Sequence, residues 1–155
     1  MLLSPFEAMK THYGEDVQVA KKNILLSNVK FTKIQRDAQT KLDTKIYRIY
    51  TAKRGDTLIG YGILINRKVR SKNAVTLYMI SAHKLRSIEI ISFNEPLEYL
   101  PTNSWQAQFE NKDTENILIL HKEIPTITGA TLSAKSIIEG SRIAFALYNE
   151  LLKEH

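Results

Sequence analysis

The spacing of apolar residues is helical near the start of the chain. A serine and a proline, followed by apolar side chains on one helical face, predict a helix from Ser4 to about His12. Ser27 or Asn28 can cap a second helix, because the residues that follow also place their apolar side chains on one face. The apolar positions of this second helix are Val29, Phe31, Ile34 and Ala38.

Between residues 46 and 93 the chain changes to runs that are rich in β-branched and aromatic residues, which predict strands. The predicted strands are Ile46–Ala52, Thr57–Ile65, Ala74–Ser81 and Arg86–Phe93. Because the links between them are short, and a parallel pair needs a long crossover, successive strands should pair antiparallel as a meander. Gly60 and Gly62, inside the second strand, predict a bulge or a close approach of another group to the backbone.

The last third of the chain returns to helical spacing. Thr102 or Asn103 can cap a short helix, and Asn116–Lys122 is predicted as a brief strand. The longest helix is predicted from Ser133 to Lys153, and its apolar stripe consists of Ile137, Ile138, Phe145, Tyr148 and Leu152. We therefore expect one domain, residues 5–153, of the α+β class: an antiparallel meander flanked by helices, with a long C-terminal helix.

Composition narrows the possible functions. The chain has 155 residues and no cysteine, which excludes disulfides, cysteine-ligated zinc and thiol catalysis. Its formal net charge is +6, and the densest basic cluster is Arg67–Lys72. Nucleic-acid binding is one interpretation of this cluster, but no aromatic-rich motif accompanies it, and we favour a solvated turn between two strands. A basic surface also suits an anionic cofactor or anionic lipid headgroups.

Motifs for common chemistry do not occur in the sequence. The four histidines match no metal motif, and the chain has no Walker loop, nucleophile elbow or dinucleotide fingerprint. We therefore predict no metal site and no catalytic residue. No apolar run reaches the ~20 residues of a membrane span, and the first residues do not resemble a signal peptide.

The segment Thr128–Thr131, Thr-Gly-Ala-Thr, stands directly before the longest predicted helix. A helix N-terminus presents unpaired N–H groups and a partial positive charge, so an anion is stabilised there without a basic side chain. Gly129 lets the backbone bend, Ala130 is small, and Thr131 and Ser133 place hydroxyls at the start of the helix. Two interpretations remain open: a hydroxyl caps the helix, or a phosphate binds there.

This tetrapeptide resembles the Ser/Thr-Gly-Ala-Thr motif of the FMN-binding domain family. That family includes flavin-carrying subunits of the sodium-pumping NADH:quinone oxidoreductase and of the Rnf complex, and small extracytoplasmic redox proteins. Gly55–Tyr61 is similar to the family's turn and Gly-Tyr strand, and Ala74–Tyr99 is similar to its central hairpin followed by Phe-x-Glu-Pro-x-Glu-Tyr. Trp105 and Phe109 match a Trp-x-x-x-Phe segment, so the resemblance spans about residues 5–152.

The resemblance implies an FMN-binding electron carrier rather than a stand-alone enzyme. In the family, the last threonine of the motif carries FMN through a phosphoester bond that a separate flavin transferase installs, and here that residue is Thr131. The cofactor contacts that the resemblance implies are Thr131, Thr128, Gly129, Ala130, Leu132, Ser133 and Glu95. It also implies a redox partner protein or a membrane electron-transport complex, and an extracytoplasmic location that is periplasmic or membrane-associated.

One position departs from the family pattern. Modifiable members carry an aspartate six residues before the acceptor threonine, whereas this chain has Pro125 there and Glu123 two residues earlier. Two alternatives to covalent attachment therefore stay open. The chain binds FMN non-covalently, or it is a cofactor-free accessory domain that has lost flavinylation.

Overall fold

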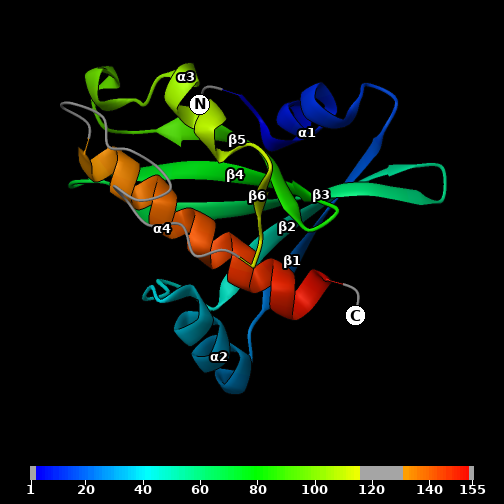
Figure 1. The fold of residues 1–155 in the computed structure, drawn as a ribbon, viewed down its shortest axis with the longest axis horizontal. Helices are drawn as coiled ribbons and strands as arrows, with labels where there is room; N and C mark the ends of the chain where they lie inside the picture. The colour runs from blue at the N-terminus through cyan, green and yellow to red at the C-terminus, as the bar shows by residue number, and fades with distance from the viewer. Residues whose placement is uncertain (1–2, 116–130, 154–155) are drawn as a thin grey trace.

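The structure, a computed structural model, describes residues 3–115 and 131–153. Its centre is a sheet of six strands in sequence order, and each strand pairs antiparallel with the next (Figure 1). The strands are β1 (Gln18–Leu25), β2 (Ile46–Arg54), β3 (Thr57–Lys68), β4 (Asn73–Ser81), β5 (Lys84–Phe93) and β6 (Lys112–Asp113). The predicted meander is confirmed.

Helices flank the sheet in the described part of the chain (Figure 1). The α-helices are α1 (Pro5–Tyr13), α2 (Asn28–Ala38), α3 (Asn103–Gln106) and α4 (Thr131–Leu147). The shorter turns are the 3₁₀ turns η1 (Leu97–Tyr99) and η2 (Ala107–Phe109), and the π-helical turn η3 (Tyr148–Leu152). Because η3 continues α4, the chain has the long C-terminal helix and the α+β class that the sequence predicts.

The predicted helix starts are confirmed for the first three helices. Ser4 Oγ accepts a hydrogen bond from the Glu7 backbone N–H at 3.1 Å, and Ser27 Oγ accepts one from the Lys30 N–H at 3.2 Å. Thr102 Oγ1 accepts from the N–H of the third residue after it at 3.2 Å. Each hydroxyl satisfies one of the N–H groups that have no partner within a first helical turn.

Several boundaries differ from the prediction. Helix α4 begins at Thr131, two residues before the predicted Ser133. Strands β1 and β6 were not predicted: β1 lies at the sheet edge with most of its side chains exposed, so it lacks the alternation that marks a half-buried strand, and β6 has two residues. The strand predicted over Asn116–Lys122 lies outside the described residues.

Each face of the sheet carries its own apolar core. Helix α1 covers one face, where Met9 packs with Tyr50, Leu77 and Met79. Helices α2 and α4, with the segment that contains Trp105, cover the other face (Figure 1). The predicted stripe of α4 faces this second core, and Ile137, Ile138, Phe145 and Tyr148 are buried there. The sheet therefore joins two cores that lie on opposite sides of it.

The sequence predicted a bulge or a close approach of another group at Gly60 and Gly62, and the structure shows both. The pairing of β2 with β3 shifts register between Ala52 and Lys53, so Ile59 is an extra residue beside Gly60. A Cβ atom on Gly60 would lie 2.5 Å from the ring of Tyr13, and one on Gly62 would lie 2.6 Å from the sulfur of a methionine in α1. The two glycines let α1 lie close against the sheet.

Candidate functional site

The first turn of α4 brings three of the predicted cofactor-binding residues together. Thr131 is the first helical residue and its side chain is exposed. Leu132 is 47% exposed, whereas Ser133 is only 1% exposed. Ser133 lies inside the helix, whereas an N-cap residue precedes the first helical turn, so the interpretation of Ser133 as the cap is wrong. A capping role of Thr131 stays a prediction.

Ser133 carries a buried hydroxyl with an unusual environment. Within the part of the chain that the structure describes, its Oγ has no hydrogen-bond partner. A buried hydroxyl without a partner costs about 1–3 kcal/mol, so most such groups are satisfied in folded proteins. A water molecule or a ligand can supply the missing partner of such a group. Ser133 therefore adds a polar group to the anion-attracting end of α4.

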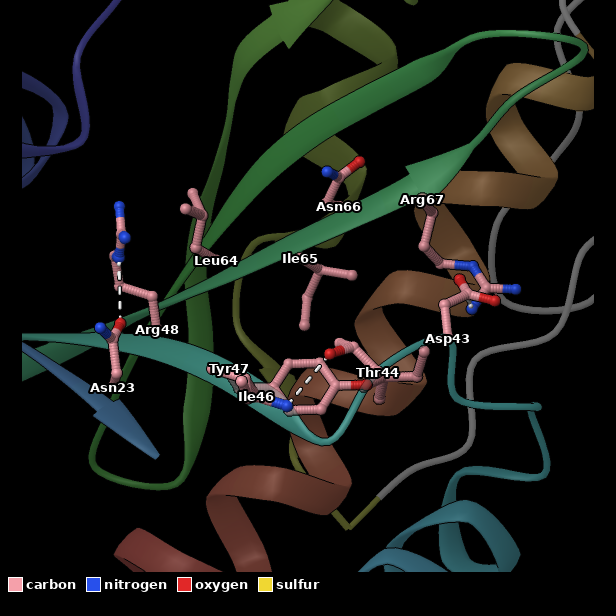
Figure 2. Close-up of a pocket in the computed structure, with 11 residues that line it drawn as sticks. Asn23, Asp43, Thr44, Ile46, Tyr47, Arg48, Leu64, Ile65, Asn66 and Arg67 are labelled. Carbon is pink, nitrogen blue, oxygen red and sulfur yellow. Dashed lines mark hydrogen bonds and ion pairs between the residues drawn. The ribbon is translucent and has the colours of Figure 1, made fainter. Parts of the chain in front are cut away.

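The basic turn between β3 and β4 lies beside the N-terminal part of α4 (Figures 1 and 2). The prediction of a solvated turn is confirmed, because Arg70, Ser71 and Lys72 are exposed between the two strands. Arg67 is the exception in this cluster: its guanidinium lies 3.2 Å from Asp43 and 3.4 Å from Glu139 of α4. These ion pairs hold the end of the hairpin against the helix.

Glu95 is the carboxylate that shapes this turn. It is 7% exposed, and its Oε1 accepts hydrogen bonds from the backbone N–H groups of Ser71 at 3.0 Å and Lys72 at 2.8 Å. The hydrogen bond from the Ser71 backbone lowers the pKa of Glu95 most, and the second backbone N–H adds to the effect. The structure thus places Glu95 against the β3–β4 turn. Glu95 in this way fixes the conformation of the turn that lies beside α4.

The turn also presents positive charge at this end of the molecule. Lys68, Arg70 and Lys72 are exposed, and the Arg70 guanidinium lies 4.6 Å from the centroid of the Tyr99 ring. A cation over an aromatic face is favourable, so Arg70 has a preferred position. The positive end of the α4 dipole adds to these charges. An anion that approaches this end meets an attractive field.

A cavity that the sequence did not predict lies between β2, β3 and the loop before β2 (Figure 2). Its volume is about 190 Å³. The ion pair of Arg67 with Asp43 lies at one end, and the Asn23–Arg48 hydrogen bond of 3.2 Å lies at the other. Its α4 residue is Ile143, which is twelve residues, or about 18 Å along the helix, from Thr131. This cavity is therefore separate from the start of α4.

The remaining predicted site residues, Thr128, Gly129 and Ala130, lie outside the described residues. Of the other predicted residues, Thr131, Leu132 and Ser133 lie in the first turn of α4. Glu95 is hydrogen-bonded to the loop between β3 and β4. The contact between Arg67 and Glu139 was not predicted from the sequence, because the two residues are far apart in the chain and no local pattern joins them. The unsatisfied hydroxyl of Ser133 was also not predictable, since it depends on tertiary burial.

The fold and this site define an α+β domain with a six-stranded antiparallel sheet, whose longest helix begins beside a basic hairpin turn. No protein-family model matches the chain, and no curated protein is significantly similar to it. In the described residues, no helix is long and apolar enough to cross a lipid bilayer.

Proposed function

We propose that this protein is an FMN-binding electron carrier in which FMN is attached through a phosphoester bond to Thr131. The observation that carries the proposal is the exposed Thr131 at the start of α4, a helix whose N-terminal part lies beside a basic turn. A phosphate there would be stabilised by the helix N–H groups and dipole. An exposed threonine would also be accessible to a flavin transferase.

The described residues fit such a group. The buried hydroxyl of Ser133 would complete its hydrogen bonding near the phosphate, and the 47% exposed Leu132 offers an aliphatic surface for the flavin ring. Exposed cations on the β3–β4 turn would balance the charge of the phosphate. The flavin, when bound, supplies the redox chemistry, and the protein supplies binding, orientation and electrostatics.

The proposal includes the partners and the location that the family resemblance implies. Loading requires a flavin transferase, and electron transfer requires a redox partner protein or a membrane electron-transport complex. The site of action is then extracytoplasmic, either periplasmic or membrane-associated.

A specific observation supports the second candidate function. Pro125 replaces the aspartate that modifiable family members carry, and proline has neither a charge nor a backbone N–H to offer a transferase. The protein would then hold FMN non-covalently, or would be a cofactor-free accessory domain. Acid precipitation separates covalent from non-covalent FMN, since it releases bound FMN but not a phosphoester-linked flavin. A purified protein without yellow colour would indicate the cofactor-free domain.

The test is co-expression of the chain with a flavin transferase, followed by mass spectrometry of the intact protein. We expect a mass increase equal to FMN less one water. The transferase would move the FMN group from a flavin dinucleotide to Thr131 Oγ1, the bond between the two phosphates would break, and the nucleoside monophosphate would leave with the threonine proton. Thr131→Ala should remove this addition. The free energy of unfolding of this variant should lie within about 1.5 kcal/mol of that of the unmodified wild type, because the side chain is exposed and one hydrogen bond contributes at most about that much.

Thr57→Ala is the matched control, since it removes another exposed threonine, at the start of β3. This variant should load as the wild type does. A flavin adduct that persists in Thr131→Ala, or that peptide mapping places on another residue, would disprove the attachment site. Flavin that co-purifies but leaves the protein in acid would establish the non-covalent alternative.

A further inference from the structure

A second cleft lies at the opposite end of α4 from Thr131. Its volume is about 270 Å³. It is bounded by β3, by the turn from β4 to β5 and by η3, and its lining includes Leu58, Tyr61, His83, Tyr148 and Leu152. Tyr148 is seventeen residues after Thr131, which is about 25 Å along a helix. This cleft is thus independent of the proposed flavin site.

The cleft combines aromatic walls with one polar pair. The rings of Tyr61 and Tyr148 meet edge to face with their centroids 6.0 Å apart. His83 Nδ1 lies 2.8 Å from the hydroxyl oxygen of Tyr148, so this hydrogen bond fixes the imidazole ring. The contact uses only Nδ1, and the second ring nitrogen, Nε2, is the one that remains for a ligand. Leu58 and Leu152 supply aliphatic surface.

The turn that carries His83 has an unfavourable backbone. Ala82 and His83 connect β4 to β5 and have φ angles of 49° and 64°. Two-residue hairpin turns with positive φ at both positions strongly favour Asn-Gly, because other side chains are strained there. Strain of this kind persists where the surrounding structure needs it, and it occurs most often at functional sites. Here it places the imidazole against Tyr148.

Two further backbone irregularities border the same cleft. The bulge of β3 adds Ile59 next to Gly60, and both residues line the cleft. The π-helical turn η3 begins at Tyr148 itself. Bulges and π-helical turns are both concentrated beside ligand and active sites, because they redirect side chains. The strained turn, the bulge and the π-turn thus converge on one cleft from three separate elements.

We propose that this cleft binds a small ligand with a single aromatic ring and a phenolic hydroxyl. The volume admits one ring, and the edge-to-face tyrosines and leucines suit a flat apolar body. If the Tyr148 hydroxyl donates to Nδ1, Nε2 carries a proton and donates to the ligand; in the other tautomer Nε2 accepts. A phenolic hydroxyl can do either, so it fits both forms of His83.

The experiment is a titration of the isotope-labelled protein with p-cresol, observed through the imidazole signals of His83 and the ring signals of Tyr61 and Tyr148. We expect saturable shifts of these signals at a single site. Toluene has the same ring and methyl group without the hydroxyl, and should bind roughly threefold to tenfold more weakly because it lacks one hydrogen bond.

Two glycine variants separate the role of the imidazole from the effect of placing a glycine at a position with positive φ. His83→Gly removes the side chain and accepts positive φ without strain, so it should stay folded and bind p-cresol roughly tenfold more weakly. Gln39→Gly makes the same kind of change at another residue with positive φ, at the C-cap of α2 and away from the cleft, and should bind as the wild type does.

Tyr148→Phe keeps the ring but frees His83, and should also weaken binding. No saturable shift up to the solubility of p-cresol would overturn the proposal. So would unchanged binding by His83→Gly, or equal weakening in Gln39→Gly.

Discussion

Glu95 illustrates how one buried carboxylate can organise a turn on another part of the chain. Its Oε1 accepts two backbone N–H bonds from the β3–β4 turn, more than twenty positions earlier in the sequence. Hydrogen bonds to a charged acceptor are stronger than those between neutral groups. They also lower the pKa of the carboxyl group, and the Ser71 backbone contributes most. The charge on Glu95 is therefore linked to the stability of the basic turn.

We predict that Glu95→Gln is less stable than the wild type at neutral pH, and that the difference narrows under acid conditions. Because folding lowers this pKa below its ordinary value of 4.5, the stabilisation is complete above about that pH and is lost as the pH falls through the folded pKa. Urea midpoints of both proteins across pH 3–7 would measure the difference in stability. Glu98→Gln, at an exposed side chain nearby, controls for the loss of one negative charge. A difference that does not change with pH would contradict the linkage.

At the scale of elements, α4 is fixed to the sheet by a contact that requires a glycine. The buried Tyr78 hydroxyl donates a hydrogen bond to the Ile137 carbonyl at 2.6 Å. A Cβ atom on Gly140 would lie 2.3 Å from that hydroxyl oxygen. Glycine is unfavourable inside a helix by about 1 kcal/mol relative to alanine. Its presence in the middle of α4 is explained by the space that Tyr78 occupies.

Gly140→Ala should therefore destabilise the protein by about 1–3 kcal/mol, the usual range for overpacking, although alanine is the better helix former. Tyr78→Phe removes the clashing oxygen, so the double variant should be more stable than the sum of the single changes predicts. Denaturant midpoints of the four proteins of this cycle would measure the coupling. A Gly140→Ala variant that is more stable than the wild type would show that the Tyr78 side chain can shift away from the added methyl group at little energetic cost.

At the scale of the whole molecule, the sheet is shared by the core under α1 and the core under α2 and α4. Trp105 is the single tryptophan of the chain and is buried in the second core. Met9 is fully buried in the first core, on the other side of the sheet. Since both cores pack on the same strands, neither can be lost without disturbing the other. We therefore expect one cooperative unfolding transition.

Met9→Ala tests this expectation because it alters only the core that is distant from Trp105. It should cost about 2–5 kcal/mol, the usual loss for a buried methionine. The tryptophan fluorescence midpoint and the far-ultraviolet circular dichroism midpoint should fall by the same amount. Phe145→Ala is the matched change in the second core, and it should also lower the fluorescence midpoint and the circular dichroism midpoint by equal amounts. Separate midpoints in Met9→Ala would mean that α1 and its core unfold independently.

The sequence by itself determined the elements with strong local signals. The caps at Ser4, Ser27 and Thr102, the alternating strands and the short links were sufficient to predict the antiparallel meander, because each depends on neighbouring residues. The long C-terminal helix and its buried stripe were predictable for the same reason. The exposed edge strand β1 was not, since an element with few buried side chains leaves no periodic pattern.

Only the tertiary structure decided how distant segments combine. It placed Glu95 in the β3–β4 turn, joined Arg67 to Glu139, and buried the Ser133 hydroxyl at the start of α4. It also brought the strained turn of His83 against Tyr148, which are 65 positions apart. Such contacts depend on how helices pack on the sheet, and that packing is set by the sum of many burial interactions rather than by any local motif.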